Sequence, residues 1–451
     1  MFPPGPKGHF LLGNVLELAP DWMGYCTRLV REYGDTVVVK FLHIPVCLVA
    51  NPEGIESILV TNYANFAKSR DYRAMEPLMG KGLLTNEGDS WRRQRKLIQP
   101  AFDHDNILRY ARIMVDRTQE MLAQWRDSQT LDIHEEMMRL TLGIAAQSLF
   151  GADITEYSKA VTGATKVAME QFNLHASLAL LLPATWRIPQ TPSLRRGVRN
   201  LDHVTFEIIA KRRASGEKHS DLLQMLLDAR DAEGNPMSEQ QLRDELRTLL
   251  LAGHETTAVA LSWTWYLLAQ HPDVEAKLQE ELQMVLAGRP PRAEDLRQLR
   301  YTEMVLKESM RLYPPAWSVG RCALAPITVN GYDFPAGMYF FLSQWITQRD
   351  PRYFTDPERF DPERWREDPV KSGNVPRFAY FPFGAGPRVC IGAGFAMMEA
   401  TLLLAAMAQK YAMQLVPGHP VEPLASVTLR PKHGIKVVLR KRPANQAARA
   451  S

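Results

Sequence analysis

The chain has 451 residues, of which 45% are hydrophobic and 23% are charged, so it can bury a large core and is not a disordered or fibrous sequence. Lys and Arg exceed Asp and Glu by only 54 − 50 = 4, a surplus too small to indicate nucleic acid as the partner. The four cysteines include no C-x-x-C pair, which argues against a disulfide framework or a zinc ribbon and favours a reducing, cytoplasmic setting.

The N-terminal sequence contains no recognisable targeting segment. Residues 1–8 read MFPPGPKG, with neither the basic stretch nor the apolar stretch of a signal peptide. The most apolar run, 248–270, carries Glu255 near its middle, where an acidic side chain costs about 2.5–3.5 kcal/mol on membrane insertion. We therefore expect this run to be a buried helix and not a transmembrane anchor.

In chain order, helical spacing comes first and then dominates. Residues 22–33 predict a helix ending at Gly34, and the Val-rich residues 36–49 predict two short strands around Ile44-Pro45. From 52 to about 283 the apolar residues recur at three and four, broken by Gly and Pro at helical lengths. A further helix closes over 308–313 before two prolines.

The C-terminal third is mixed. Short strand signals run from 323 to 341, and an aperiodic stretch rich in Pro, Arg and aromatics runs from 349 to 387, a length typical of functional loops. A helix is expected over about 392–411, a strand pair over 426–440 and a frayed tail over 443–451. Without repeats or a Gly/Ser linker, the sequence predicts a single, mainly helical domain over 1–451.

Cys390 lies in the segment FGAGPRVCIG, residues 383–392. A lone cysteine is usually a small buried hydrophobe. Here it directly precedes an expected helix, whose N-terminal dipole favours the thiolate, while Gly386 and Gly392 let the backbone curl towards the sulfur. With the positive charge of Arg388 two residues away, the loop suits a thiolate that holds a large anionic partner, of which haem is the obvious one.

The spacing F-x-x-G-x-R-x-C-x-G in this loop resembles the haem-binding signature of the cytochrome P-450 family of haem-thiolate monooxygenases. The resemblance extends over essentially the whole chain. It implies a mainly α fold with a small β-lobe, haem b (iron protoporphyrin IX) and Cys390 as the proximal iron ligand, with Phe383 and Gly392 also at the cofactor.

A second motif, AGHETT at 252–257, carries a polar cluster inside an apolar helix predicted over about 240–270. Thr256 follows Ala252 by four residues and Gly253 by three, so the three share one helical face. On the residues alone, Thr256 could equally bond back to its own helix and bend it. The motif resembles the family's oxygen-activation sequence, which implies that Thr256 holds bound dioxygen and a water while Glu255 relays protons.

Glu308 and Arg311 are spaced i, i+3, commonly a surface pair worth a few tenths of a kcal/mol. In the family this pair is buried and is joined by an arginine further along the chain, which locks the loop leading to the cysteine. Arg364 of the PERW sequence is our expected third member, and Arg359 of the similar DPERF sequence is the alternative. The resemblance implies a structural role for these residues.

The run WRRQRK at 91–96 would ordinarily be a solvated basic helix face. The family has W-x-x-x-R here, which implies that Trp91 and Arg95 face the haem propionates; Arg321 and Arg388 match two further propionate-binding arginines.

The remaining cations of this run form what we call the α5 basic patch: Arg92, Arg93 and Lys96. They are expected to point outward on the cysteine side of the haem, where a positive surface would suit an acidic electron donor.

The substrate is expected to be hydrophobic. By position, residues 69–85, 167–186, 316–319 and the turn near Ser426 resemble the family's substrate-contacting segments. The expected pocket residues are Phe172, Ala252, Ala316, Trp317 and Val319, although plain core packing would also explain apolar residues there.

The stretch RLYPP at 311–315 resembles the branches that hydroxylate long-chain fatty acids. Only Lys40 and His43 could anchor a carboxylate in the strands before position 50, so a neutral terpenoid or steroid is the alternative.

Three functions compete. The leading one is a monomeric, cytoplasmic bacterial-type monooxygenase that uses dioxygen and takes electrons from a separate ferredoxin or flavodoxin with its NAD(P)H reductase. A haem-thiolate peroxygenase, isomerase or dehydratase would need no such donor, but relatives of that kind usually lack the acid–threonine pair present here as Glu255-Thr256. A non-enzymatic haem sensor would need neither that pair nor an apolar access region.

Overall fold

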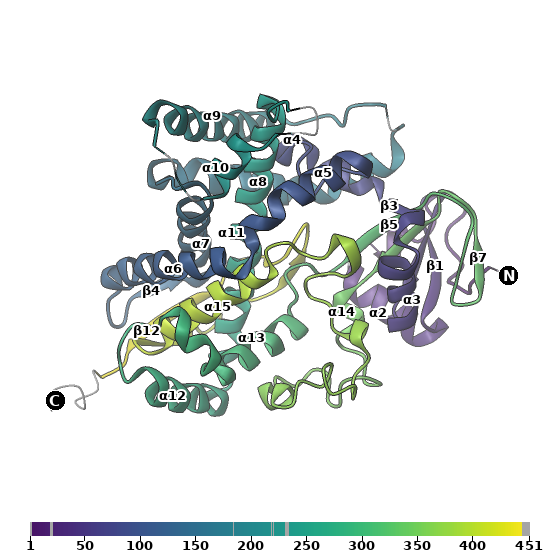
Figure 1. Ribbon diagram of the computed structural model, residues 1–451. Coiled ribbons are helices and arrows are strands. Elements are labelled where there is room, and N and C mark those ends of the chain that lie inside the picture. Colours follow the sequence, from purple (N-terminus) through teal and green to yellow (C-terminus); the bar gives the residue numbers. More distant parts are fainter. Residues whose placement is uncertain are drawn as a thin grey trace. The chain divides into compact units, whose positions relative to one another are not determined.

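The computed structural model describes residues 2–18, 21–183, 185–217, 219, 221–230 and 234–443, and Figure 1 draws the chain. The tail expected to fray lies outside the described residues from 444 onward. The chain forms two compact units, each assembled from separated stretches: 1–71, 307–390 and 427–429 in the first, and 72–306, 391–426 and 430–451 in the second. That both belong to a single haem domain remains a prediction.

The first unit contains a five-stranded sheet in the order β1-β2-β8-β5-β3. Strands β1 (Thr36–Phe41) and β2 (Ile44–Val49) pair antiparallel and join at Leu42, whose φ is 55°. The turn therefore lies before Ile44-Pro45, which begins β2 and does not form the bend.

The other strands of this sheet come from distant parts of the chain. β8 (Tyr339–Leu342) runs parallel to β2, and β5 (Val319–Ala323) pairs antiparallel with both β8 and β3 (Phe66–Lys68). A separate hairpin joins β6 (Ile327–Val329) to β7 (Tyr332–Phe334) through Asn330-Gly331, both at positive φ as this turn requires.

Helix α2 (Trp22–Tyr33) confirms the first predicted helix. The Asp21 carboxylate accepts the backbone N–H of Gly24 at its start, and Gly34 at φ 98° ends it. The other helical elements of the unit are short: α1 (Val15–Leu18), α3 (Pro52–Glu56), η1 (Ser57–Thr61), η2 (Tyr63–Asn65), η3 (Arg70–Ala74, continuing into the second unit), α14 (Gln344–Thr347), η7 (Pro362–Trp365), η8 (Arg377–Ala379) and η9 (Gly386–Arg388).

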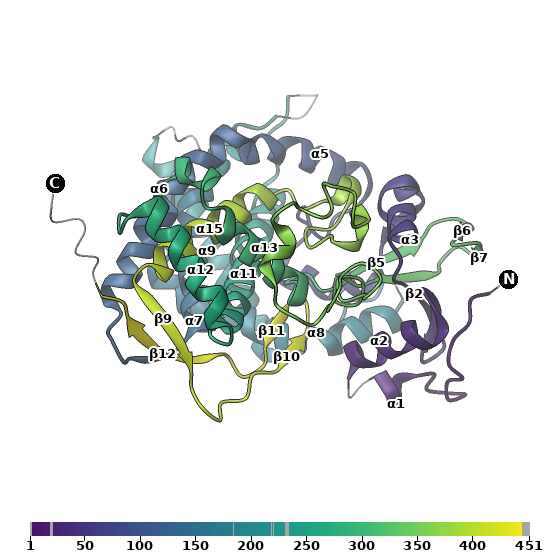
Figure 2. The same cartoon turned by 90° about the horizontal axis from the view of Figure 1, so that it is seen from below.

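The second unit is helical and is organised around α11 (Glu239–Leu268), which packs against α7 (Ile133–Phe150), α9 (Pro192–Ser215) and α15 (Ala393–Ala408) (Figures 1 and 2). The predicted buried helix is thus confirmed, and among the described residues no helix is long and apolar enough to cross a membrane. Ser238 caps α11 by accepting the N–H of Gln241 at 3.2 Å.

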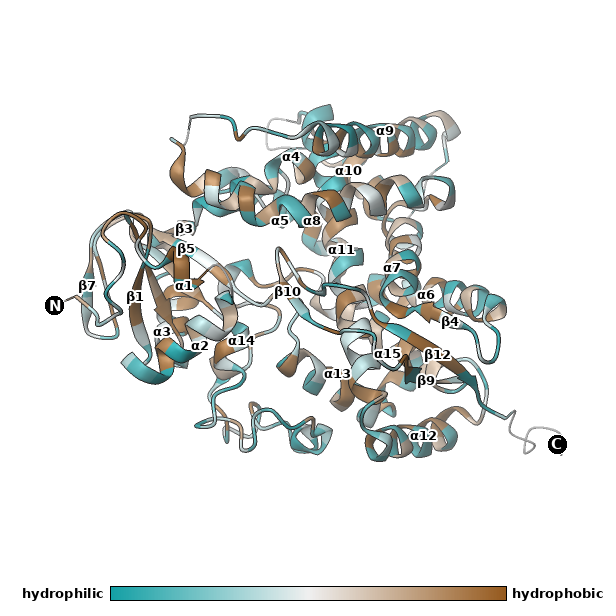
Figure 3. Ribbon diagram, turned by 180° about the vertical axis from the view of Figure 1, so that it is seen from behind, coloured by the Kyte–Doolittle hydropathy of each residue, from teal (hydrophilic) through white to brown (hydrophobic). Residues whose placement is uncertain are grey.

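The remaining helices of this unit include amphipathic ones such as α12, whose alternating colours Figure 3 shows. They are α4 (Glu76–Met79), α5 (Gly88–Ile98), η4 (Gln99–Phe102), α6 (His104–Gln124), η5 (Thr155–Tyr157), α8 (Ser158–Leu181), α10 (Leu222–Asp228), α12 (Pro272–Leu286), η6 (Ala293–Arg297) and α13 (Arg300–Leu312), which crosses into the first unit.

The C-terminal strands differ from the predicted pair. β12 (Lys436–Lys441) pairs with β9 (Tyr411–Leu415) and with β4 (Thr130–Asp132), and not with its nearest neighbour in sequence, β11 (Leu429–Pro431) (Figure 2). The predicted helix 392–411 correspondingly stops at Ala408, because Tyr411 begins β9. The remaining strand is β10 (Pro423–Ala425).

Candidate functional site

The cysteine loop of the first unit is shaped by backbone contacts. The N–H of Cys390 donates to the carbonyl of Phe383 at 2.9 Å, which closes the loop on itself. Gly386 has φ 66°, and a Cβ there would lie 1.9 Å from the carbonyl oxygen of Leu59, so only glycine fits this close approach. The loop is rooted in the hydrophobic core through Phe381 and Ala385.

Cys390 is the exposed cysteine among the four. Burial raises the pKa of the Cys26 thiol to about 12 and also raises the pKa values of Cys47 and Cys322. Thiolate is the form that binds a metal, so those three sites disfavour ligation. The chemistry of the four thiols therefore singles out Cys390.

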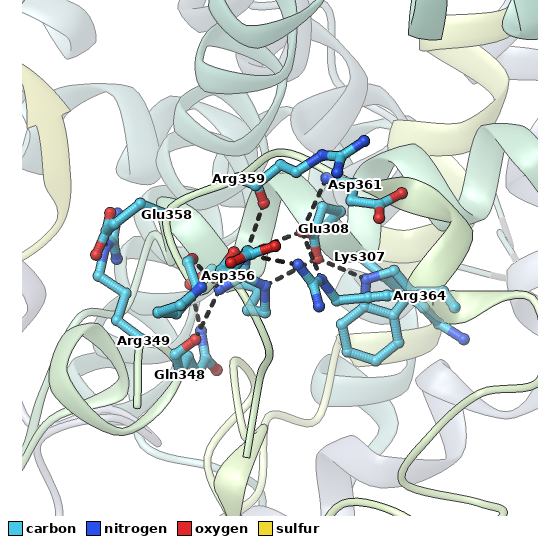
Figure 4. Close-up of polar contacts among 12 residues, drawn as sticks. Lys307, Glu308, Gln348, Arg349, Asp356, Glu358, Arg359, Asp361 and Arg364 are labelled. Atoms are coloured by element: carbon cyan, nitrogen blue, oxygen red, sulfur yellow. Dashed lines mark hydrogen bonds and ion pairs between the residues drawn. The ribbon is translucent and has the colours of Figure 1, made fainter. Parts of the chain in front are cut away.

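Glu308 is the centre of a buried polar network in the first unit (Figure 4). Its carboxylate accepts two bonds from Arg311, at 2.9 and 2.8 Å, and one from Nε of Arg364 at 3.1 Å. Both Glu308 and Arg311 have side chains that are 0% exposed. Arg359 contributes only its backbone carbonyl, to Arg311, so the guanidinium that reaches Glu308 is that of Arg364.

Two members of this network, Trp365 and Gln348, were missed by the sequence reasoning. The indole of Trp365 donates to Glu308 at 2.9 Å. Gln348 donates to the carbonyls of Met310 and Arg311 and accepts the N–H of Phe381, which ties α13 to the start of the cysteine loop.

Arg349 stacks on the ring of Trp345 with 3.4 Å between its guanidinium carbon and the ring centroid, and burial lowers its pKa to about 10. Trp365 could have been noticed within the PERW sequence; nothing local distinguishes Gln348 or Arg349.

The predicted residues around β5 differ in exposure. Arg321 is buried and donates to the carbonyl of Gly320 at 2.8 Å, while Arg388 is half-buried. Ala316 and Val319 are also half-buried, but Trp317 is buried against the ring of Phe341, with centroids 5.6 Å apart. Trp317 therefore packs in the core.

In the second unit, α11 has one open patch. From Asp244 to Trp265, a stretch described in full, every residue is buried except Ala252, Gly253 and Thr256. The three lie on one face, as their spacing predicts, and two of them are small. This break in an otherwise buried helix is the place where a flat ligand could approach the backbone.

The polar residues of the motif are arranged around that patch. The Thr256 hydroxyl donates to the Ala252 carbonyl at 2.9 Å, the back-bonded arrangement, and Glu255 is buried. His254 is fully buried, and its Nδ1 lies 2.9 Å from the Leu250 carbonyl, within hydrogen-bonding distance. Burial lowers the pKa of His254 to about 4, so its ring is neutral near pH 7.

Glu399 on α15 is a buried acid that the sequence reasoning missed. The Thr257 hydroxyl interacts with it but is directed to the Gly253 carbonyl at 3.4 Å, and neither carboxyl oxygen has a well-formed hydrogen bond among the described residues. Burial raises the pKa of Glu399 well above its usual value, which favours its protonated form.

Helix α5 separates its cations as predicted from the W-x-x-x-R spacing. Trp91 is buried and Arg95 is half-buried, whereas all three residues of the α5 basic patch are exposed. On α8, Phe172 is half-buried, and Leu174 is exposed.

These residues fit haem b. An exposed thiol on a glycine-shaped loop supplies the donor that haem-thiolate iron requires, and the α11 patch offers small residues beside a hydroxyl and a carboxyl. Among the described residues no cluster of three or more His, Cys, Asp or Glu side chains could hold a metal ion.

Comparison with known proteins gives one family. A model described as "Cytochrome P450" matches residues 3–439. The chain is 35% identical to cyclooctatin synthase of Streptomyces melanosporofaciens, covering 94% of this chain and 92% of the relative. It is 35% identical to cyclooctat-9-en-7-ol 5-monooxygenase of the same organism (90% and 88%) and 32% identical to pentalenene oxygenase of Streptomyces avermitilis (93% and 96%).

Proposed function

Because the chain belongs to the cytochrome P450 family, we propose that it hydroxylates a neutral terpenoid, using electrons from a separate ferredoxin or flavodoxin. Members of this family carry haem b and insert one atom of dioxygen into a hydrophobic organic substrate. Two relatives are named for oxidising cyclooctat-9-en-7-ol and pentalenene, which supports a terpenoid. Further support comes from Lys40 and His43, the only residues of strands β1 and β2 and their turn that could anchor a fatty-acid carboxylate, because both are exposed to solvent.

The observation that carries the catalytic proposal is the open patch on α11. Bound haem b would supply the centre at which dioxygen is reduced and cleaved, with Cys390 as its thiolate ligand. Ala252 and Gly253 would leave room for the flat group, and the half-buried Thr256 places a hydroxyl at the same opening. Two protons must reach the reacting oxygen in an apolar pocket, so an acid and a hydroxyl at this position are the required chemistry.

The proton path in this proposal uses side chains of one helix. The Thr256 hydroxyl donates a hydrogen bond to the Ala252 carbonyl, which leaves the lone pairs of the hydroxyl oxygen available to accept a hydrogen bond from an incoming donor. Glu255, which is buried and precedes Thr256 in the chain, would pass protons towards that hydroxyl. Phe172, Ala316 and Val319, all half-buried, would contribute apolar surface for the substrate.

The arginines would neutralise the haem carboxylates. Arg95, Arg321 and Arg388, with Trp91, are proposed to bind the two propionates, because unpaired charge in an apolar site is costly. Phe383, Gly392 and Gly253 would line the cofactor. The buried network of Glu308, described above, is proposed to hold the cysteine loop and not to take part in the chemistry. The exposed α5 basic patch would receive the acidic donor.

The substrate is tested by titrating the haem-loaded protein with neutral cyclic terpenoids and with long-chain fatty acids, while following the spin-state change of the haem. We expect saturable shifts with terpenoids and weaker or no shifts with fatty acids. The reverse order would refute the terpenoid assignment.

The cofactor ligand is tested by Cys390→Ser, with Cys322→Ser as the matched control. Only the thiolate donates enough charge to produce the red-shifted absorption of the reduced carbon monoxide complex, so Cys390→Ser should lose this band and the control should keep it. Loss of the band in the control alone would overturn the ligand assignment.

A further inference from the structure

The segment 77–83, which comprises the last three residues of α4 and the start of the connection to α5, is held on the first half of α11 by side chains that bind its backbone. Asp244 accepts the N–H of Lys81 at 2.9 Å, and Glu245 accepts the N–H of Leu83 at 2.9 Å. Thr248 donates to the carbonyl of Met79 at 3.0 Å. These bonds satisfy backbone groups of an irregular segment that runs along a buried helix. We call this segment the 77–83 strap.

Two glycines let the strap lie directly on α11. A Cβ at Gly80, whose φ is 66°, would lie 2.0 Å from Oδ1 of Asp244, and a Cβ at Gly82 would lie 2.2 Å from the hydroxyl of Thr248. Any larger residue would lift the strap away from the helix. Thr248 is one helical turn, about 6 Å, before Ala252, so the strap is seated next to the open patch.

Arg247 extends the attachment to a third element. Its guanidinium donates to the carbonyls of Leu78 at 2.8 Å and Pro77 at 3.0 Å, and it pairs with Asp202 on α9 at 2.5 Å. The first half of α11 therefore holds the strap from both ends: Arg247 binds residues 77–78 and the two carboxylates bind residues 81 and 83.

We propose that Glu245 is a positioning residue for substrate binding, and that the charge on its carboxyl sets how firmly the 77–83 strap is held on α11. This rests on the proposed function, because the strap binds Thr248, one turn of α11 before the open patch on which that function depends. The hydrogen bonds of Glu245 come from the strap and from Gln241, so it acts through the strap.

The surroundings of Glu245 make its charge costly. Its side chain is buried at 0% exposure, and this burial raises its pKa to about 7. The adjacent carboxylate of Asp244 pushes in the same direction, while the Leu83 N–H and the Gln241 amide, which donate to Glu245, oppose the shift. From the strap Lys81 directs its backbone N–H to Asp244, and from α5 the uncharged Gln94 reaches the Lys81 carbonyl.

The sign of the effect follows from linkage. A carboxyl whose pKa is about 7 when the strap is seated, and about 4.5 when it is released to water, binds its proton more tightly in the seated state. Raising the pH therefore favours release. With these two values the equilibrium constant for release rises about tenfold between pH 6 and pH 8.

Amide hydrogen exchange of the haem-loaded, substrate-free protein measures this directly. After correction for intrinsic exchange, the peptide covering 77–85 in the wild type should lose about tenfold of its protection between pH 6 and pH 8. Glu245→Gln mimics the neutral acid in shape and bonding, so its protection should vary less than twofold over the same range. The control is Glu239→Gln: Glu239 lies on α11 like Glu245, but it is exposed and pairs with Arg213 of α9. This variant should keep the wild-type response.

Two results would overturn the proposal. One is an unchanged wild-type protection at the two pH values, which requires no variant; the other is a full pH response in Glu245→Gln. The role in binding is tested by Glu245→Ala, which should weaken the spin-shift affinity for a terpenoid at least fivefold without changing the ratio of product to peroxide. Unchanged affinity despite lost protection would remove the substrate role. If no terpenoid shifts the spin state of the wild type, the proposed function fails while the exchange result stands.

Discussion

Removing the carboxylate of Glu308 should destabilise the first unit more than any surface change near it. Glu308→Ala removes the acceptor of Arg311, Arg364 and the Trp365 indole, and also of the Asp361 N–H at 3.1 Å. Arg311 would remain a cation with a 0% exposed side chain and no carboxylate beside it.

The expected cost follows from burial. Breaking a buried ion pair from one side costs about 3–5 kcal/mol, because the remaining charge is uncompensated. Arg311 keeps bonds to the carbonyls of Gln348, Pro357 and Arg359, which places its share at the lower end of that range. The Trp365 indole adds about 1–3 kcal/mol as an unpaired buried donor. We therefore expect a loss of at least about 3 kcal/mol.

Urea denaturation of the haem-loaded protein, followed by fluorescence and by the haem absorption band, measures this loss. Arg364→Ala should cost less, about 1–2 kcal/mol, since that side chain is 13% exposed and supplies one bond to Glu308. The matched control is Glu358→Gln, because Glu358 pairs with Arg349 at 3.3 Å but is 67% exposed; it should cost less than about 1 kcal/mol. If Glu308→Ala costs no more than this control, the buried network does not stabilise the unit as we argue.

Thr256→Ala should keep haem content and substrate affinity but lower the ratio of product to hydrogen peroxide. The control Thr257→Ala, at a residue buried outside the patch, should change this ratio much less. An unchanged ratio in Thr256→Ala would assign the proton path to other groups. Reversing the charges of the α5 basic patch should slow electron transfer from the donor and flatten the salt dependence of its rate, because exposed charges steer association over about 8–10 Å. Reversing Arg195, Arg196 and Arg199 of α9, which are also exposed, is the control. An equal effect of the two sets of changes would place the docking site elsewhere. The pKa of His254 is about 4 in the native state against 6.5 when unfolded, so stability is lost as the pH falls from about 6.5 to 4. Denaturation curves measured across that range should show that His254→Gln removes on the order of 3 kcal/mol of this acid sensitivity. A variant as acid-sensitive as the wild type would contradict the assignment of His254 as a buried neutral ring.

The features that the sequence determined by itself are those in which a few neighbouring residues decide the conformation. Asp21 and Gly34 begin and end α2 by capping, and Asn330-Gly331 forms the β6–β7 turn, because each depends on local backbone geometry. The same holds for the spacing that puts Ala252, Gly253 and Thr256 on one face of α11. The glycines around Cys390 and the separation of cations on α5 are also local patterns.

Only the tertiary structure decided which strands, helices and side chains pair with one another. β12 pairs with β9 and β4 and not with its sequence neighbour, and β2 lies beside β8 almost 300 residues later. Trp317 is buried because the ring of Phe341, from strand β8, lies against it. Gln348 and Glu245 carry no local signal, since their significance comes from backbone groups of distant segments that have lost water. Such contacts depend on which surfaces the whole chain buries together, and helical or strand periodicity contains no record of that choice.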